Sequence, residues 1–458
     1  MHGHADILEF WQDISGFLGC YYLAAAVLNV LAAVHLWRTG TGLRLFRVGR
    51  LTATSAHLWL LIGIGFGLLA PLAWTGQPQW MQWVSLPRGL RDFLDRLLSP
   101  TWFLVGLMSL LAVLFAARRF FVKPSIAWAG LNLALLAMGL SLTDPDFAAI
   151  VTKPDNVPIV AMVFLLGFFT WLSAHRAVQN DARLAHGEPP LEALESDKVL
   201  VWPDLVYIEL ICMVALTAVL IFWAIGLQAP LEDPANPMKT PNPSKAPWYF
   251  VGLQELLVYY DPWLAGVVLP SLIIFGLCAI PYLDRNPAGN GYYTIAQRKF
   301  AYVVFQFGFL VLWVTPIVLG TFFRGPKWAF FGPFEAWDAH KTESLYNVSL
   351  AKYFWVHWLG IGRPMAGADA GLGSRLLYIL FREAPGIILL GLYFAVLPLV
   401  LARWSRLFRG LLQSLGRVHY LLVLGLLLLM ALLPIKMFAR WTVNLTYFIS
   451  IPEYFLNF

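Results

Sequence analysis

The chain has 458 residues, of which 59% are hydrophobic and only 13% are charged, with a formal net charge of +6. A soluble domain carries roughly 25% charged residues because its surface faces water, so this composition excludes an ordinary soluble enzyme. The content of 20 Trp, 17 Tyr and 33 Phe suits aromatic belts at both membrane interfaces. We attribute the positive charge to membrane topology and expect no nucleic acid partner.

The three cysteines do not form a metal-binding pattern. Cys20, Cys212 and Cys278 each lie inside an apolar run, and the sequence contains no C-x-x-C pair. This spacing argues against a thiolate-held zinc or iron–sulfur site and excludes covalent attachment of a c-type haem. We expect buried free thiols and predict no metal ligands.

Ten apolar runs are long enough to cross a bilayer, which takes about 20 residues per helix. They lie at about 15–37, 51–74, 101–117, 124–143, 158–178, 204–227, 262–282, 298–320, 376–401 and 418–436. The sequence therefore predicts an all-α fold, a polytopic transmembrane helix bundle of about ten spans, whose first partner is the lipid membrane.

Basic residues between the spans predict the orientation of the bundle. Three Arg-rich loops follow spans 1, 3 and 9, and they contain Arg38, Arg44, Arg47, Arg50, Arg118, Arg119, Lys123, Arg403, Arg406, Arg409 and Arg417. With ten spans, all three loops fall on the same side of the membrane. We place them in the cytoplasm and both termini outside, in the periplasm, and expect a multi-pass protein of the bacterial cytoplasmic (inner) membrane.

The predicted spans divide into two halves. Residues 1–180 supply five spans, and a polar cytoplasmic linker follows at 181–200. Residues 201–458 supply five more spans and a long outer loop at 321–374, which is rich in Trp, Gly and Pro.

The stretch from Val201 to Asp284 contains the most informative residues. Its Pro-rich outer loop leads through Pro247-Trp248-Tyr249-Phe250 into a short amphipathic segment with Gln254 and Glu255. Aromatic rings beside a carboxylate at a membrane edge are typical of a quinone pocket, in which the carboxylate takes a proton from the quinol.

This stretch resembles the C-terminal half of cytochrome b and the separate subunit IV of chloroplast-type cytochrome b complexes. Three features stand in the family's order: Trp202-Pro203-Asp204, Pro247-Trp248-Tyr249-Phe250 and Pro281-Tyr282-Leu283. The resemblance is centred on residues 201–284. It implies a quinol-oxidising site on the outer side, with Pro247, Trp248, Tyr249 and Phe250 at the quinone. We add Gln254 to the quinone-binding residues and take Glu255 as the candidate catalytic carboxylate, with a Glu255 that only faces the outer headgroups or a partner subunit as the alternative.

The chain departs from that family in two ways. The family's Pro-Glu-Trp-Tyr motif lacks its Glu here, because Pro247 directly precedes Trp248. Glu255 lies seven residues after Trp248 and is our candidate to replace it. The family holds two b haems with histidine pairs spaced fourteen apart, and no span of this chain has such a pair. A haem b is therefore not supported by the usual spacing.

Six other residues are candidates for a haem site or a proton path. His35, His57, His175 and His419 fall at the cytoplasmic ends of their spans, where they would ligate one haem, move protons at an inner quinone site, or bond separately to backbone and phosphate groups. Arg382 and Glu383 fall within the ninth run. They would mark a proton path, bind a buried carboxylate of a partner, or form a structural ion pair between helices.

The leading interpretation is a membrane subunit of a respiratory electron-transfer complex that forms, or derives from, a quinol/quinone site for menaquinone or ubiquinone. The enzyme would be the quinol-oxidising or quinone-reducing assembly, with partner subunits that carry haem b, haem c or iron–sulfur centres. A redox-inactive membrane anchor for extramembrane electron-transfer subunits is the alternative. A transporter fits less well, because the two halves lack matching Gly- or Pro-broken helices.

Overall fold

Long apolar helices make up most of the computed structural model, which describes residues 4–48, 51–194, 198–227, 234–284, 293–341, 347–367 and 370–458. Within these residues, nine helices are long and apolar enough to cross a membrane, and a bent pair supplies a tenth candidate. The predicted all-α, polytopic bundle of about ten spans is therefore confirmed.

The nine spans are formed by α1 (His4–Thr39), α2 (Ser55–Trp74), α7 (Pro124–Ser141), α9 (Val157–Ala185), α11 (Val206–Gly226), α13 (Leu269–Leu283), α14 with α15 (Lys299–Gln306 and Thr315–Val318), α18 with α19 (Ala384–Gly391 and Leu397–Trp404) and α21 (Arg417–Val443). The tenth candidate is α5 (Pro100–Ala116), which follows α3 (Pro78–Met81) and α4 (Arg88–Leu97) after a bend of 83°.

Shorter elements connect these spans. The short helices are α6 (Arg118–Phe121), α8 (Pro145–Val151), α10 (Leu191–Leu194), α12 (Trp248–Leu256), α16 (Leu350–Lys352), α17 (Leu372–Arg382) and α20 (Arg406–Leu415). Three small two-stranded sheets complete the described chain: antiparallel β1 (Arg44–Val48) with β2 (Leu51–Thr54), parallel β3 (Val348–Ser349) with β4 (Leu445–Tyr447), and antiparallel β5 (Ser450–Ile451) with β6 (Leu456–Asn457).

The helices begin where the sequence offers proline or a capping side chain. Pro100, Pro124 and Pro158 each stand in the first turn of a span, where the missing N–H costs no hydrogen bond. Asp144 caps α8 by accepting hydrogen bonds from the N–H groups of Asp146 and Phe147. Between such starts, the apolar runs bond their backbone internally, as a lipid environment requires.

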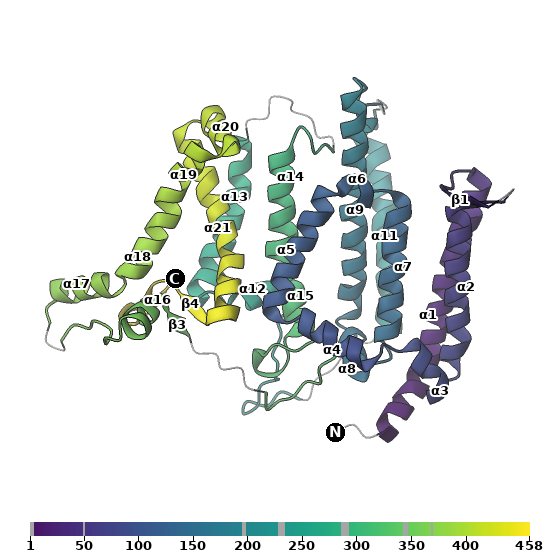
Figure 1. Ribbon diagram of the computed structural model, residues 1–458, viewed down its shortest axis with the longest axis horizontal. Coiled ribbons are helices and arrows are strands. Elements are labelled where there is room, and N and C mark those ends of the chain that lie inside the picture. The colour runs from purple at the N-terminus through teal and green to yellow at the C-terminus, as the bar shows by residue number, and fades with distance from the viewer. Residues whose placement is uncertain are drawn as a thin grey trace.

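The connections sort to the two ends of the bundle. Figure 1 shows the β1–β2 hairpin, α6 and α20 at one end, and α4, α8 and α12 at the other. The first three belong to the three Arg-rich loops, so this arrangement agrees with the predicted placement of those loops on one side. That this side is cytoplasmic, with both termini outside, stays a prediction.

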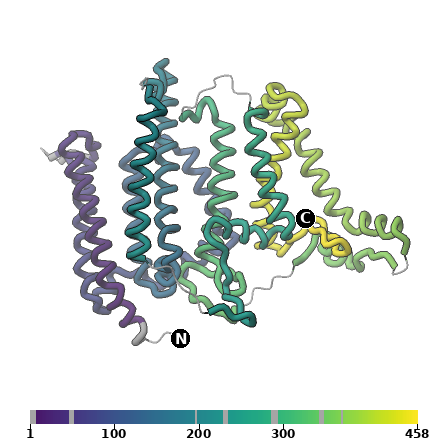
Figure 2. Tube along the Cα trace, turned by 180° about the vertical axis from the view of Figure 1, so that it is seen from behind, coloured from purple at the N-terminus to yellow at the C-terminus, as the bar shows by residue number. Residues whose placement is uncertain are grey.

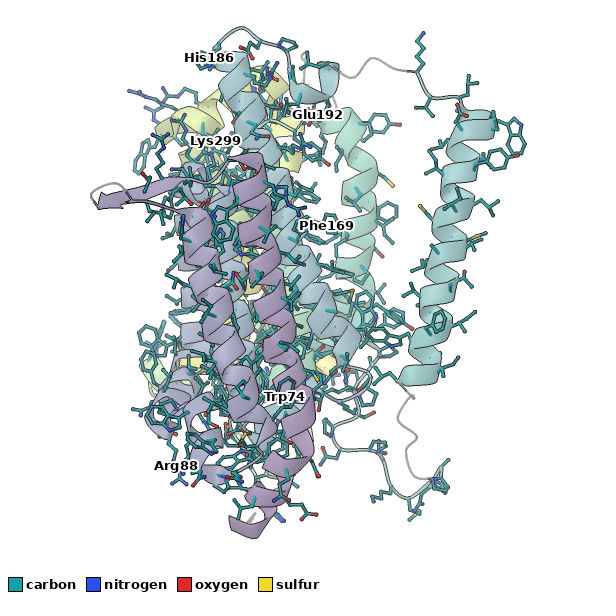
Figure 3. The ribbon with its side chains drawn as sticks, turned by 90° about the vertical axis from the view of Figure 1, so that its right-hand side faces the viewer. Trp74, Arg88, Phe169, His186, Glu192 and Lys299 are labelled. Atoms are coloured by element: carbon teal, nitrogen blue, oxygen red, sulfur yellow. The ribbon has the colours of Figure 1, made fainter. Side chains whose placement is uncertain are left out.

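The spans spread along the long axis of the molecule. The α1–α2 pair lies at one end of this axis and α17 to α20 at the other (Figures 1 and 2). α11 stands apart from its neighbours, as Figure 3 shows, and the 26-residue span Val201–Gly226 to which it belongs has none of its most apolar window buried. Its neighbours in a membrane are therefore lipids or other subunits.

Residues of the two predicted halves contact each other extensively. Asp95 accepts a hydrogen bond from the N–H of Phe334 at 3.0 Å, and the rings of Phe103 and Phe323 lie 5.5 Å apart. On the opposite side, Asn180 donates to the carbonyl of Tyr293 at 3.0 Å. The division at residues 181–200 stays a prediction about domains, but the halves pack as neighbours.

The ninth span begins later than the apolar run predicted. The expected run was 376–401, whereas the spanning helix is Ala384–Trp404 and α17 forms a separate helix before it. The break falls at Glu383, whose φ of −91° and ψ of 5° are not helical, and Pro385 stands in the first turn of α18. Arg382 and Glu383 thus lie at the junction of two helices instead of two turns inside the span.

The C-terminal tail packs on this junction through buried charges. Arg382 donates to Glu453 at 2.6 and 2.9 Å and to Glu383 at 2.9 Å, and Glu383 accepts from the N–H of Ser450 at 3.0 Å. Hydrogen bonding to Arg382 lowers the pKa of Glu453 to about 2, so this carboxylate is ionised at neutral pH. The pair Arg382 and Glu383 therefore anchors the tail.

Gly386 packs closely against the C-terminal tail, so substitutions at this position test that contact. A Cβ at Gly386 would lie 1.9 Å from the carbonyl oxygen of Phe448, whereas one at Gly391 on the same helix would meet nothing within 4 Å. Alanine favours a helix over glycine by roughly 1 kcal/mol at both positions. We expect Gly386→Ala to lower the midpoint of thermal unfolding in detergent and Gly391→Ala to leave it equal or higher. Equal midpoints for the two variants would contradict this packing.

Candidate quinone site at α12

A short helix, α12, holds the aromatic motif at the end of the bundle away from the Arg-rich loops (Figure 1). Pro247 precedes it with φ −51° and ψ 151°, an extended conformation from which Trp248 starts the helix. The rings of Trp248 and Tyr249 meet edge to face at 5.7 Å, and those of Tyr249 and Phe250 lie 4.8 Å apart. All three side chains are 41–54% exposed, so the motif presents aromatic surface outward.

Gln254 fixes the loop before α12 to the helix itself. Its Oε1 accepts a hydrogen bond from the N–H of Ala246, and its Nε2 donates to the carbonyl of Ser244, both at 2.8 Å. These bonds use the amide that the sequence analysis assigned to quinone binding. Gln254 therefore orients Pro247 and Trp248 through the backbone that precedes them.

Glu255 is fully buried and is engaged by four donors. Arg324 donates from Nε and Nη2 at 2.9 and 2.8 Å, as a bidentate pair. Trp328 donates from its indole N–H at 3.0 Å, and the hydroxyl of Tyr259 donates at 2.8 Å. A carboxylate offers about four lone-pair sites, so a proton can add to Glu255 only where one of these donors withdraws.

The partners of Glu255 were not identified from the sequence. Arg324 is only 2% exposed and follows the eighth apolar run, 69 residues after Glu255. A single cation directly after an apolar run is a weak signal, since such residues usually reach the headgroups. The stronger signal is the isolated acid on α12 itself, because a buried carboxylate requires a cationic or hydrogen-bonding partner.

A small cavity lies beside Tyr249 where α12 meets the neighbouring spans. Its volume is about 30 Å³, and its lining comprises Tyr249, Gly252, Leu253, Leu256, Ile273, Leu312, Trp313 and Ile317. Gly252 allows the close approach, because a Cβ there would lie 3.0 Å from Ile317 Cγ1. Such a volume holds about one water, whereas pockets for small-molecule ligands span roughly 300–1,000 Å³.

Lys245 connects the loop before α12 to the end of the eighth span. Its Nζ donates to the carbonyl of Thr321 at 2.8 Å and lies 4.8 Å from the centre of the Trp337 ring. Burial lowers the pKa of Lys245 to about 8. This residue adds a second cation to the region behind α12, which already contains Arg324.

The remaining candidates lie elsewhere in the bundle. His35 and His57 belong to the α1–α2 pair, His175 to α9 and His419 to α21, which are spread along the long axis (Figure 1). His57 Nδ1 lies 3.0 Å from Thr54 Oγ1, and His175 Nδ1 lies 2.9 Å from the carbonyl oxygen of Val122. The four histidines therefore lie on four different helices, of which α1 and α2 pack against each other.

The described residues also contain no group of three or more His, Cys, Asp or Glu side chains placed to hold a metal ion. Arg382 and Glu383 lie in the tail-anchoring network described above.

The buried Glu255–Arg324 pair predicts a large difference between single and double substitutions. Arg324→Gln leaves the carboxylate buried without its cation, which costs about 3–5 kcal/mol of unfolding free energy. Glu255→Gln combined with Arg324→Gln removes both charges and should cost less than the sum of the single changes.

The matched control is Lys153→Gln, because the Lys153–Asp155 pair has both side chains 51% exposed and should contribute less than about 1 kcal/mol. Denaturant unfolding of the detergent-solubilised protein gives the unfolding free energy of Arg324→Gln, Glu255→Gln, the double variant and Lys153→Gln. A loss in Arg324→Gln no greater than that in Lys153→Gln would rule out a stabilising pair.

Comparison with known proteins identifies the part of the chain that contains α12. Residues 234–323 match the family model described as Cytochrome b(C-terminal)/b6/petD. No solved structure matches the chain. The matched range includes Pro247 to Phe250, Glu255 and the spans that line the cavity beside Tyr249. Residues 234–323 of this chain are therefore similar to the cytochrome b C-terminal family, as the resemblance predicted.

Proposed function

We propose that this chain is the quinone-contacting membrane subunit of a respiratory electron-transfer complex, with its quinol/quinone site at α12. The observation that carries this proposal is the exposed aromatic motif Trp248-Tyr249-Phe250 inside the family-matched segment, next to a cavity between spans. Aromatic walls suit the planar headgroup of menaquinone or ubiquinone, which arrives from the lipid.

Tyr249 controls access in this proposal. It lines the cavity, is 48% exposed, and its hydroxyl makes no hydrogen bond with any residue that the structure describes. Rotation of this side chain enlarges the cavity toward the lipid without breaking a polar contact. Leu253, Ile273 and Ile317 then form the apolar wall against which the quinone ring packs.

Proton release determines the role of Glu255. Oxidation of a quinol yields two electrons and two protons, and the electrons pass to a redox centre of a partner subunit. Glu255 accepts one of the two protons when one of its four donors withdraws, and the other proton passes to water on the outer side. The neutral donors Tyr259 and Trp328 withdraw at lower cost than Arg324, because Arg324 supplies the charge that compensates the buried carboxylate. In this proposal Arg324 stays bound and holds the carboxylate in place.

The electron path requires other subunits. Because no span has the family's histidine pair spaced fourteen apart, the proposal assigns haem b, haem c or iron–sulfur centres to partners in a multi-subunit complex. The chain itself supplies the binding surface, the proton acceptor and the membrane frame. We place the complex in the bacterial cytoplasmic membrane, with α12 on the outer side and the Arg-rich loops in the cytoplasm.

A redox-inactive anchor is the second candidate function, and two observations favour it. All four lone-pair sites of Glu255 are occupied, and the cavity of about 30 Å³ holds only about one water. In this role the aromatic motif would bind a partner subunit or lipid, and the Glu255–Arg324 pair would serve stability alone.

Substitution of Tyr249 separates the two functions. Tyr249→Leu removes the ring at the cavity and should lower quinol oxidation by the intact complex roughly tenfold or more, a loss of about 1.4 kcal/mol of transition-state stabilisation. Tyr282→Leu is the matched control, because Tyr282 is also in the family-matched range and is 78% exposed. It lies at the end of α13 away from Ile273, which lines the cavity.

Turnover is measured in membranes that contain equal amounts of the assembled complex. Glu255→Gln leaves Arg324 without its anion and should lower the amount of assembled complex. Turnover per assembled complex should also fall, and this fall should vary with pH if Glu255 accepts a proton. Unchanged turnover per assembled complex in both Tyr249→Leu and Glu255→Gln would support the anchor instead.

A further inference from the structure

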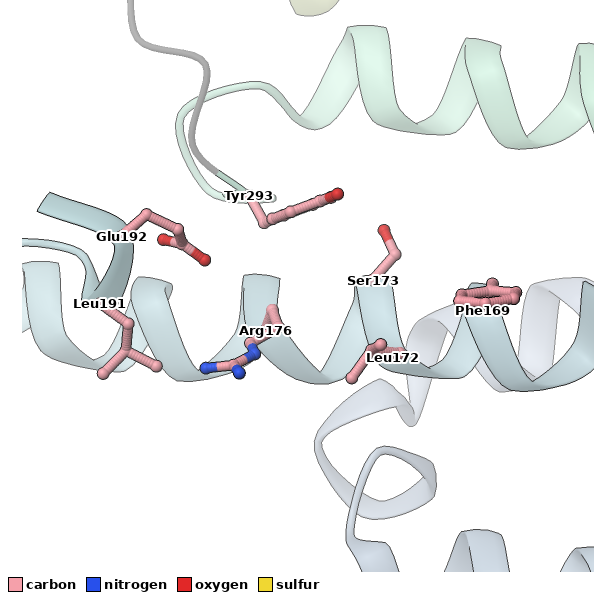
Figure 4. Close-up of a pocket in the computed structure, with 7 residues that line it drawn as sticks. All are labelled: Phe169, Leu172, Ser173, Arg176, Leu191, Glu192 and Tyr293. Carbon is pink, nitrogen blue, oxygen red and sulfur yellow. The ribbon is translucent and has the colours of Figure 1, made fainter. Parts of the chain in front are cut away.

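A second cavity lies far from α12, at the end of the bundle that contains the Arg-rich loops. Its volume is about 310 Å³, which is within the range of small-molecule sites. It is bounded by α9, by α10 in the linker and by the segment before α14, with a lining of Phe169, Leu172, Ser173, Arg176, Leu191, Glu192 and Tyr293 (Figure 4).

Two side chains of α9, the buried Asn180 and the half-buried Asp181, hold the walls of this cavity in place. Asn180 is fully buried and donates to Glu192 at 2.7 Å and to the carbonyl of Tyr293 at 3.0 Å, while its Oδ1 accepts from the N–H of Leu191 at 2.9 Å. Asp181 accepts from the N–H groups of Ile295 and Ala296 at 3.1 and 3.0 Å. The linker and the segment before α14 are thus both fixed to α9.

Opposite charges line the cavity without neutralising each other. Arg176 makes no hydrogen bond or ion pair with any residue that the structure describes, and Glu192 bonds only to Asn180 among them. Ser173 adds a hydroxyl from the same face of α9, and the ring of Tyr293 extends toward Ser173, with Glu192 on its other side in this view (Figure 4). This arrangement suits a ligand with an anionic and a cationic group a few atoms apart.

The depth of the cavity fits the boundary between headgroups and acyl chains. Glu192 lies toward the end of the bundle, and Phe169 lies closer to its middle (Figure 3). Below the charged residues, α9 exposes Leu165 and Phe169, 54% and 58% exposed, which lie one turn apart on the face that carries Arg176. The polar part of the cavity therefore continues into an apolar surface along one spanning helix.

We infer that this cavity binds a phospholipid with a zwitterionic amine headgroup, of the phosphatidylethanolamine class. Arg176 and Ser173 bind the phosphate as charge-assisted and neutral donors, respectively. Glu192 and the face of Tyr293 bind the ammonium group. The acyl chains follow Phe169 and its apolar neighbours along α9. The bound lipid joins the linker, α9 and the segment before α14.

Native mass spectrometry of the purified full-length chain, titrated with phosphatidylethanolamine or phosphatidylglycerol, tests this site. The wild-type chain should retain phosphatidylethanolamine in preference to phosphatidylglycerol. Arg176→Gln should weaken binding of both lipids roughly tenfold, because both contain the phosphate. Glu192→Gln should remove only the preference, since phosphatidylglycerol has no amine.

Two control variants make the same change of charge at the same end of the bundle but outside the cavity. Arg119→Gln removes an exposed cation of α6 that does not line the cavity, and Glu188→Gln removes a linker acid that pairs with Arg183 at 3.1 Å. Both should leave the lipid preference unchanged. Equal lipid binding in all variants, or a preference lost equally in the controls, would overturn the proposal. Loss of a co-purifying quinone instead of a lipid from Arg176→Gln would also overturn it.

Discussion

The carboxylate of Glu255 and the guanidinium of Arg324 meet in a region from which water is excluded, and this ion pair fixes α12 against the chain that leaves the eighth span. A buried charge without a partner costs several kcal/mol, so each residue requires the other. Trp328 and Tyr259 complete the set of donors and connect α12 to the helices behind it. The exposed aromatic motif at the start of α12 depends on this anchor, because nine residues are too few to hold a helix in place without tertiary contacts.

The spanning helices could be predicted from the sequence, because apolar runs in lipid have only one common way to bond their backbone. The start of the ninth span was predicted too early, since hydropathy does not register the break at Glu383 before Pro385. The aromatic motif was predicted from its order in the family. The partner of Glu255 was not, because a contact between residues 69 positions apart leaves no local pattern, and Arg324 follows an apolar run as any interfacial cation would.

The two ends of the bundle present surfaces of different chemistry. The end with α12 contains the family-matched motif, whose rings face outward beside a small apolar cavity. The other end contains the Arg-rich loops and a larger cavity lined by Arg176 and Glu192. The first arrangement suits an apolar ring from the membrane interior, and the second suits a charged headgroup. α11, which buries nothing against this chain, adds a surface for the subunits that a redox complex of this family implies.

Photolabelling of the native complex with an azido-quinone reports contact between the quinone and the chain, independently of turnover. The labelled chain is digested and the modified peptides are identified by mass spectrometry. A quinone site at α12 predicts label within Trp248–Leu256 and on the cavity-lining part of Lys299–Phe323, with loss of that label when unmodified quinone is in excess. Competable label confined to residues outside 234–323, or to a partner subunit alone, would contradict a quinone site at α12.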